Sequence, residues 1–271
     1  MSEEERSIQS QFDLTGRVAI VTGASGWLGA AMSRALAEAG ATLAVTSRNA
    51  NQAQDFAATL PEPASGASHR GYALAQADTD SIPAFVAQVV ADLGQVDILV
   101  NNAYGGPAPD IETATAEDFD NAYHTGVTAY FLLAREVARH LRARQVPGSI
   151  INIASMYGVV ASYPEAYAEL PVNSPPSYHG LKGGLIHLTR HLAAYWAKDG
   201  IRVNAISPGA FPKPVVKDGM PEFIGRLEAK VPLGRMGLPE ELKGICVLLA
   251  SDAGSYMTGQ NILVDGGWTA W

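Results

Sequence analysis

Short apolar runs rich in β-branched residues alternate along the chain with helical stretches. The runs lie at residues 17–23, 42–48, 71–78, 97–103, 149–155, 202–209 and 261–267. Because they are continuous rather than alternating, they predict strands that are covered on both faces, as in a parallel sheet. The strand–helix rhythm with right-handed crossovers therefore predicts a doubly wound, Rossmann-like α/β fold.

Two segments interrupt this rhythm. Residues 162–176 are rich in Pro, Tyr and Glu, and residues 211–228 carry Pro212, Pro214 and Pro221. Both follow predicted strands at the carboxyl edge, where open α/β sheets bind ligands. We predict two substrate loops here, and the alternative is a pair of mobile connections.

The ends of the chain complete the domain organisation. Residues 1–13 are polar and acidic, and we expect them to be disordered or frayed. Residues 14–271 have the length and apolar content of a single α/β domain with one core.

Composition and charge narrow the class of partner. The net charge of −8 argues against binding to nucleic acid or to an anionic membrane. The one cysteine, Cys246, lies in an apolar run and reads as a buried structural thiol. The sequence offers neither a membrane-spanning run nor a secretion signal. We expect a cytoplasmic protein that binds a small molecule and no metal.

A glycine-rich turn, TGASGWLG, joins the first strand to an Ala-rich helix. Gly23, Gly26 and Gly29 stand where side chains would block the approach of a pyrophosphate. Backbone N–H groups and the helix dipole would face that group. The turn predicts a dinucleotide site; the alternative is a turn that merely connects two elements.

The end of the second strand indicates which dinucleotide is preferred. It ends at Ser47 and Arg48 without a carboxylate, so the ribose 2′-OH has no acidic partner and a 2′-phosphate can be accommodated. We predict a preference for NADP(H), with NAD(H) as the alternative if Arg48 only stacks on the adenine. Asp78 and Thr79, at the expected end of the third strand, are candidate adenine contacts or simply a polar strand end.

Tyr178 and Lys182 are the candidate acid–base pair. Four residues apart on a predicted helix, they share one face. A phenol with a pKa near 10 is a poor acid–base group at neutral pH, and a neighbouring ammonium favours the phenolate. Lowering the pKa by about three units requires roughly 4 kcal/mol. Ser155, at the end of a strand, could hydrogen-bond the substrate oxygen.

Taken in order, these motifs resemble the classical short-chain dehydrogenase/reductase family over nearly the whole chain. The matching segments are TGASGWLG, the Asp78 region, NNAYG, NIAS, YHGLK, NAISPG and VDGG. The resemblance implies a seven-stranded parallel sheet with helices on both faces. It also implies a homotetramer or homodimer formed through long helices, here residues 115–144 and 177–199.

The resemblance further implies an NAD(P)(H)-dependent oxidoreductase that interconverts a secondary alcohol and a ketone or aldehyde. Tyr178 would be the acid/base, Lys182 would lower its pKa and hold the nicotinamide ribose, and Ser155 would orient the substrate. The implied cofactor contacts also include Gly23, Ser25, Gly26, Leu28, Gly29, Asn101, Ala103, Pro208, Gly209 and Phe211.

Three positions depart from the family pattern. Trp27 stands where the middle glycine is usual, and Tyr104 stands where glycine is common, which should narrow the site. Gly126 aligns with an Asn that many members use to hold a water for proton transfer. The interval from Ser155 to Tyr178 is also longer than usual, which places residues 163–176 on the substrate side.

Charges in the two loops suggest a small polar substrate such as a sugar, sugar acid or polyol. They are carried by Lys213, Lys217, Arg226, Glu165 and Glu169. Solvated surface charges explain them equally well. The alternatives are a 3-oxoacyl or xenobiotic carbonyl reductase, and a dinucleotide-binding sensor or scaffold with weak redox activity.

Overall fold

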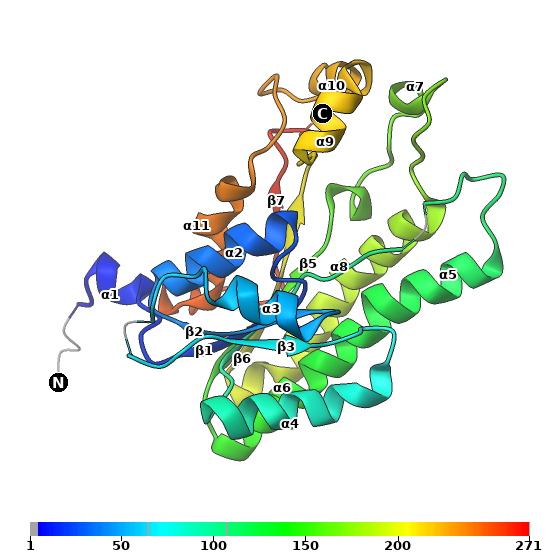
Figure 1. Ribbon diagram of the computed structural model, residues 1–271. Helices are drawn as coiled ribbons and strands as arrows, with labels where there is room; N and C mark the ends of the chain where they lie inside the picture. Colours follow the sequence, from blue (N-terminus) through cyan, green and yellow to red (C-terminus); the bar gives the residue numbers. More distant parts are fainter. Residues whose placement is uncertain (1–4, 64, 107, 271) are drawn as a thin grey trace.

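A single seven-stranded sheet organises the molecule (Figure 1). The computed structural model describes residues 5–63, 65–106 and 108–270. The strands are β1 (Val18–Val21), β2 (Thr42–Ser47), β3 (Arg70–Ala73), β4 (Ile98–Asn101), β5 (Gly148–Ile153), β6 (Ile201–Pro208) and β7 (Asn261–Val264). Their order is β3-β2-β1-β4-β5-β6-β7 and every pair is parallel. The predicted doubly wound parallel sheet is therefore confirmed, and its order reverses direction between β1 and β4, where such sheets bind ligands.

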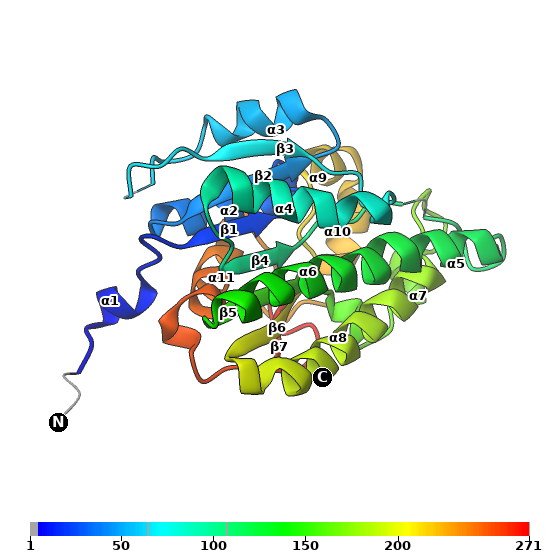
Figure 2. The ribbon, with the colours of Figure 1, turned by 90° about the horizontal axis from the view of Figure 1, so that it is seen from below.

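Helices cover both faces of the sheet. One face packs against α2 (Trp27–Glu38), α3 (Ala50–Ala57) and α11 (Lys243–Ala250). The other packs against α4 (Ile82–Leu93), α6 (Ala129–Arg144) and α8 (Pro176–Trp196), which lie side by side in Figure 2.

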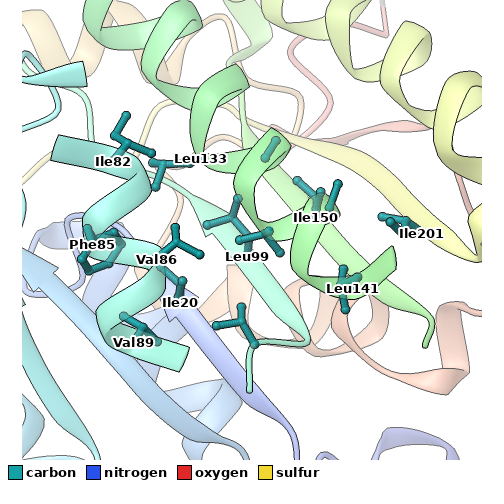
Figure 3. Packing of buried hydrophobic residues seen from close by; sticks show 14 of the residues in the cluster. Ile20, Ile82, Phe85, Val86, Val89, Leu99, Leu133, Leu141, Ile150 and Ile201 are labelled. Atoms are coloured by element: carbon teal, nitrogen blue, oxygen red, sulfur yellow. The ribbon is translucent and has the colours of Figure 1, made fainter. Parts of the chain in front are cut away.

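The core explains why the strands read as continuous apolar runs. Ile20, Leu99 and Ile150 come from three neighbouring strands and face α4 and α6, where Phe85 and Leu133 meet them (Figure 3). The opposite faces of these strands are buried as well, so no residue of β1 or β4 reaches solvent. Each large aliphatic side chain buried in this way contributes about 1.5–3 kcal/mol.

The N-terminal segment differs from its prediction. Residues 8–12 form a short helix, α1 (Ile8–Phe12), whose first turn is capped by the Ser7 hydroxyl, which accepts from the Ser10 amide. Arg6 donates to Asp252 at 2.6 Å and ties the segment to the body of the protein. We expected residues 1–13 to be disordered or frayed; the structure describes this helix within residues 5–13, and residues 1–4 lie outside the described chain. A local cap and an ion pair hold the segment where no α1 side chain is buried.

The long helix expected over residues 115–144 is broken in the middle. A capping box between Thr115 and Asp118 starts α5 (Ala116–Tyr123), and a π-helical turn, His124–Thr128, separates it from α6. Such turns often occur at functional sites. None of the helices in the described ranges has both the length and the apolar character needed to traverse a bilayer.

Candidate active site

The glycine turn brings backbone close to backbone at the start of α2. Gly23 has φ +60°, and a Cβ there would stand 2.9 Å from the Cα of Ala103. A Cβ at Gly29 would stand 2.3 Å from the carbonyl oxygen of Gly23. The helix cap, Gly26, offers no side-chain acceptor to the first-turn N–H groups. These donors and the helix dipole are therefore free for an anion, and the turn fits a pyrophosphate.

A cavity of about 730 Å³ opens at this turn and crosses the carboxyl ends of the strands. Its walls come from segments far apart in the sequence. They are the glycine turn, the end of β2, residues 74–77, residues 102–105, the end of β5, one face of α8 and the end of β6. Its volume suits a dinucleotide together with a small substrate.

The charged side chains in the cavity wall are all basic. Arg48, Lys182 and Lys213 line it, and no Asp or Glu does so among the described residues. Arg48 lies directly after β2, where an acidic side chain would bind a ribose 2′-OH. The wall therefore suits a polyanionic dinucleotide that carries a further 2′-phosphate.

Ser155, Tyr178 and Lys182 converge at one end of the cavity. Ser155 follows β5, and its hydroxyl accepts from the Tyr157 amide at 3.1 Å. Tyr178 and Lys182 are one turn apart on α8. Lys182 is 3% exposed, and its ammonium donates to the Ile153 carbonyl at 2.6 Å. The end of β5 and α8 thus bring together the three residues predicted from separate motifs.

Burial dominates the electrostatics of this group. It lowers the pKa of Lys182 to about 7. It also raises the pKa of Tyr178, while a hydrogen bond with Ser155 lowers it. The ammonium centre lies 5.5 Å from the ring centroid of Tyr178. While Lys182 carries its proton, the positive charge beside the ring favours the phenolate over the phenol, and the pair can then exchange a proton with a substrate oxygen.

Comparison with known proteins identifies the family. The family model described as Enoyl-(Acyl carrier protein) reductase matches residues 23–269. The chain belongs to the short-chain dehydrogenase/reductase family. It is an NAD(P)-dependent oxidoreductase that acts on alcohols.

Relatives of this dehydrogenase/reductase match it almost end to end. An NADP-dependent mannitol dehydrogenase from Hypocrea jecorina is 36% identical over 265 residues, covering 95% of this chain and 94% of its own. A D-threitol dehydrogenase from Mycolicibacterium smegmatis is 33% identical and covers 98% of both chains. The crystal structure of a gluconate 5-dehydrogenase from Burkholderia cenocepacia, in complex with NADP and tartrate, superposes with a TM-score of 0.85 at 31% identity. That superposition covers 97% of this chain and 99% of that one.

Most residues that the sequence predicted to contact the cofactor line the cavity, and three do not. The residues in the wall are Gly23, Ser25, Gly26, Leu28, Gly29, Ser47, Arg48, Ala103, Tyr178, Lys182, Pro208, Gly209 and Phe211. Asp78 and Thr79 lie outside it because β3 ends at Ala73, five residues earlier than Asp78. Gln76 and Ala77 take their place in the wall.

Asn101 is the third exception. Its side chain is buried and donates to Asn152 Oδ1 at 2.9 Å and to the Tyr130 carbonyl, which ties β4 to β5 and α6. The neighbouring Asn102 lines the cavity instead and donates to the carbonyl oxygens of Thr22 and Gly23. The alternation of side chains at the end of β4 is the signal that separates the two asparagines.

Two departures from the family pattern meet in space. Gly126 is buried in the π-helical turn, and the ring of Tyr104 lies beside its Cα. The third, Trp27, lines the cavity at the start of α2. The Nε2 atom of the nearby His124 lies 2.9 Å from the carbonyl oxygen of Ala77.

The two predicted loops contain short helices and pack on each other. They hold α7 (Pro164–Tyr167), α9 (Pro214–Gly219) and α10 (Pro221–Glu228). Arg226 of α10 donates to the carbonyl oxygens of Glu165 and Ala168, and the rings of Tyr167 and Phe223 lie 5.2 Å apart. Both loops share a small apolar cluster with Trp268, which is 1% exposed. The two loops therefore pack as one unit, and of their described residues Phe211 and Lys213 line the cavity.

The loop charges do not act together at the cavity as the sequence suggested. Lys213 lines the cavity, but Arg226 is engaged with carbonyls and with Glu222. Glu165, Glu169 and Lys217 are exposed and stand outside the cavity wall.

Proposed function

We propose that the protein is an NADP(H)-linked dehydrogenase/reductase that interconverts a secondary alcohol and a ketone or aldehyde in a small polar substrate. The substrate class is a sugar, a sugar acid or a polyol. The observation that carries the proposal is the convergence of Ser155, Tyr178 and Lys182 at the end of a cavity lined by Arg48 and by no carboxylate among the described residues. The mannitol, threitol and gluconate dehydrogenases named above, two of them linked to NADP by name or title, support it.

The residues divide the chemistry between them. When bound, the nicotinamide supplies or accepts the hydride. The Ser155 hydroxyl, at the carboxyl end of β5, donates a hydrogen bond to the substrate oxygen. Tyr178 gives that oxygen a proton in the reductive direction and removes one in the oxidative direction. Lys182 stabilises the phenolate that remains, because its ammonium is buried beside the ring.

The cofactor would lie along the cavity in one direction. The N–H groups at the start of α2 would hold the pyrophosphate, and Arg48 with Ser47 would hold the 2′-phosphate. Gly209 must lack a side chain because a Cβ there would stand 2.6 Å from the Cα of Asp265. This close approach of β6 to the segment after β7 would shape the nicotinamide end.

We also propose a homotetramer or homodimer, assembled through α5 and α8. Phe119 and Tyr123 on α5 are 37% and 38% exposed, and Tyr195 on α8 is 64% exposed and stacks on His191. Such aromatic side chains are typical of interface centres. Light scattering after size exclusion tests this, and Tyr195→Glu should shift the assembly toward the monomer. We further propose a cytoplasmic location, which cell fractionation checks.

Substrate class is tested by turnover. Purified protein is mixed with NADPH and with ketoses, keto sugar acids, 3-oxo esters and aromatic ketones, and absorbance of the reduced cofactor is followed. We expect the highest kcat/KM with a ketose or keto acid and at least 100-fold less activity in Tyr178→Phe, a loss within the range typical of general acid–base catalysis. A preference for 3-oxo esters or aromatic ketones would support the acyl or xenobiotic alternative. Tight NADPH binding without any turnover would support the sensor alternative.

A further inference from the structure

We propose that Tyr104, accommodated by Gly126, is a positioning residue that closes an aromatic cage around the Lys182 ammonium and keeps water from it. The proposal rests on the catalytic role of Lys182, but the labelling test below reads the cage without any turnover.

The first observation is that residues 104 and 126 share one volume. A Cβ built on Gly126 would stand 3.1 and 3.2 Å from the Cδ2 and Cε2 atoms of Tyr104, and 3.0 Å from Leu181 Cδ1. Real Cβ atoms are rarely this close to other heavy atoms. A Cβ at 126 therefore requires Leu181 and the Tyr104 ring to give way by a few tenths of an ångström, and a larger side chain requires more. A ring at 104 and a glycine at 126 thus form a matched pair.

The second observation is the surroundings of the ammonium. The Nζ atom of Lys182 lies 5.4, 5.9 and 5.5 Å from the ring centroids of Tyr104, Tyr130 and Tyr178. All three distances are within the range of cation–π attraction. The rings come from the loop after β4, from α6 and from α8. The carbonyl oxygen of Ile153 on β5 completes the set.

No carboxylate of the described residues balances this charge. Among the described residues Lys182 takes part in no ion pair, and the titratable groups that face it are the three tyrosines. Burial raises the pKa values of Tyr104, Tyr130 and Tyr178, so all three stay neutral near pH 7. The ammonium is therefore held by ring faces and one carbonyl.

Tyr104 is the removable wall of this cage. Tyr130 is 1% exposed in the core, and Tyr178 is the acid/base itself. Tyr104 lines the cavity and lies against Tyr178, with ring centroids 5.4 Å apart at 50°. Its ring thus packs against the Tyr178 ring and stands beside the ammonium at the cavity wall, which Lys182 also lines.

The sign of the effect follows from hydration. Burial lowers the pKa of Lys182 to about 7. Removing the Tyr104 ring loses one cation–π contact, which lowers the pKa, but it admits water, which raises it toward 10.5. Hydration of an ammonium outweighs one ring contact, so we expect the pKa to rise.

Competitive labelling of the apo protein tests the cage. The protein is treated with trace acetic anhydride across pH 6 to 11, and mass spectrometry reads the Lys182 peptide, which gives both the midpoint and the accessibility of the amine. We expect Tyr104→Ala to raise the midpoint by about one unit or more, a tenfold change in proton affinity, and to increase the limiting rate. Tyr104→Phe keeps the ring and should keep both values near wild type. The control is Tyr256→Ala, at a fully exposed tyrosine.

Two outcomes would overturn the cage: an unchanged midpoint and rate in Tyr104→Ala, or equal shifts in Tyr104→Phe and Tyr104→Ala. Thermal denaturation checks that each variant folds, and Tyr104→Leu replaces Tyr104→Ala if the latter does not. The dependence of kcat/KM on pH should shift in Tyr104→Ala by the same amount as the midpoint of Lys182 labelling. A uniform loss of activity with an unmoved profile would indicate a merely structural role.

A double-mutant cycle tests the pairing. Gly126→Val should displace the ring and increase Lys182 labelling, whereas the helical control Gly184→Ala, whose Cβ meets Tyr123 at 3.8 Å, should not. In a protein that already carries Tyr104→Ala, Gly126→Val should increase Lys182 labelling much less than it does in the wild type. If the two increases multiply in full, the residues act independently and the pairing is wrong.

Discussion

Replacing Lys182 by methionine should stabilise the fold while destroying activity, and the stabilisation should depend on pH. Lys182 is 3% exposed, and burial lowers the pKa of its ammonium from 10.5 to about 7. Below pH 7 the folded protein must carry this charge out of water. At 1.36 kcal/mol per pKa unit, the shift corresponds to a cost of roughly 5 kcal/mol.

The pH window follows from the direction of the shift. Between pH 7 and 10.5 the unfolded chain keeps the proton and the folded protein releases it. The unfolded state therefore binds more protons, and stability rises with pH in this window by up to about 1.4 kcal/mol per unit. The cost is fully present below pH 7 and is absent above 10.5. Burial raises the pKa of Tyr178, so that group adds no slope of its own below pH 10.

Part of the stabilisation is offset. Methionine cannot donate to the Ile153 carbonyl, which Lys182 now contacts at 2.6 Å, and an unsatisfied buried carbonyl costs about 1–3 kcal/mol. Lys182→Met should still unfold with a free energy about 2–4 kcal/mol higher than wild type at pH 6. That advantage should shrink as the pH rises.

Urea unfolding at fixed protein concentration and at pH 6, 7.5, 8.5 and 9.5 measures the difference between the two proteins. Lys198→Met, at an exposed lysine on the turn after α8, is the matched control and should show no trend. A difference between Lys182→Met and wild type that stays constant from pH 7.5 to 9.5 would refute the reasoning. It would mean that Lys182 remains charged and well compensated in the folded state.

Other variants probe the remaining parts of the site. Arg48→Ala should raise the Kd for NADPH by about 10- to 100-fold, because a charged hydrogen bond is lost, and should leave the Kd for NADH nearly unchanged. Equal effects on the two Kd values in fluorescence titrations would mean that Arg48 does not bind the 2′-phosphate. Gly71→Ala should destabilise the fold by about 3 kcal/mol, because its Cβ would stand 2.1 Å from the Gln54 amide nitrogen. Gly225→Ala, whose Cβ would meet nothing within 4 Å, should not destabilise it; equal urea midpoints would contradict this. Arg226→Ala should raise KM more than it lowers kcat, because α10 loses its hydrogen bonds to the carbonyl oxygens of Glu165 and Ala168. A fall in kcat alone would indicate that Arg226 takes part in the catalytic step.

Some features followed from local sequence. The unbroken apolar runs gave the strands because side chains buried on both faces leave no polar alternation, and all seven strands fall within the predicted runs or within one residue of them. The glycine turn was readable because only glycine permits the approaches at Gly23 and Gly29. The absence of an acidic residue directly after β2 could likewise be seen from the sequence alone.

Other features were not readable locally. β3 ends at Ala73, the last residue paired with β2, so Asp78 does not stand at the strand end where the sequence placed it. Asn101 and Asn102 differ only in which side of the strand end each faces. The N-terminal segment is held by Arg6 and Asp252, which are 246 residues apart.

The sequence by itself determined the chemistry that is available: a phosphate-binding turn, a basic strand end, and a hydroxyl, a phenol and an amine in a recognisable order. Only the tertiary structure decided how Tyr104, Gly126 and Lys182 meet, because a loop, a π-helical turn and α8 come together there. No spacing along the chain encodes that two unusual residues share one volume. The burial that lowers the pKa of Lys182 is likewise a property of the assembled core and not of the lysine.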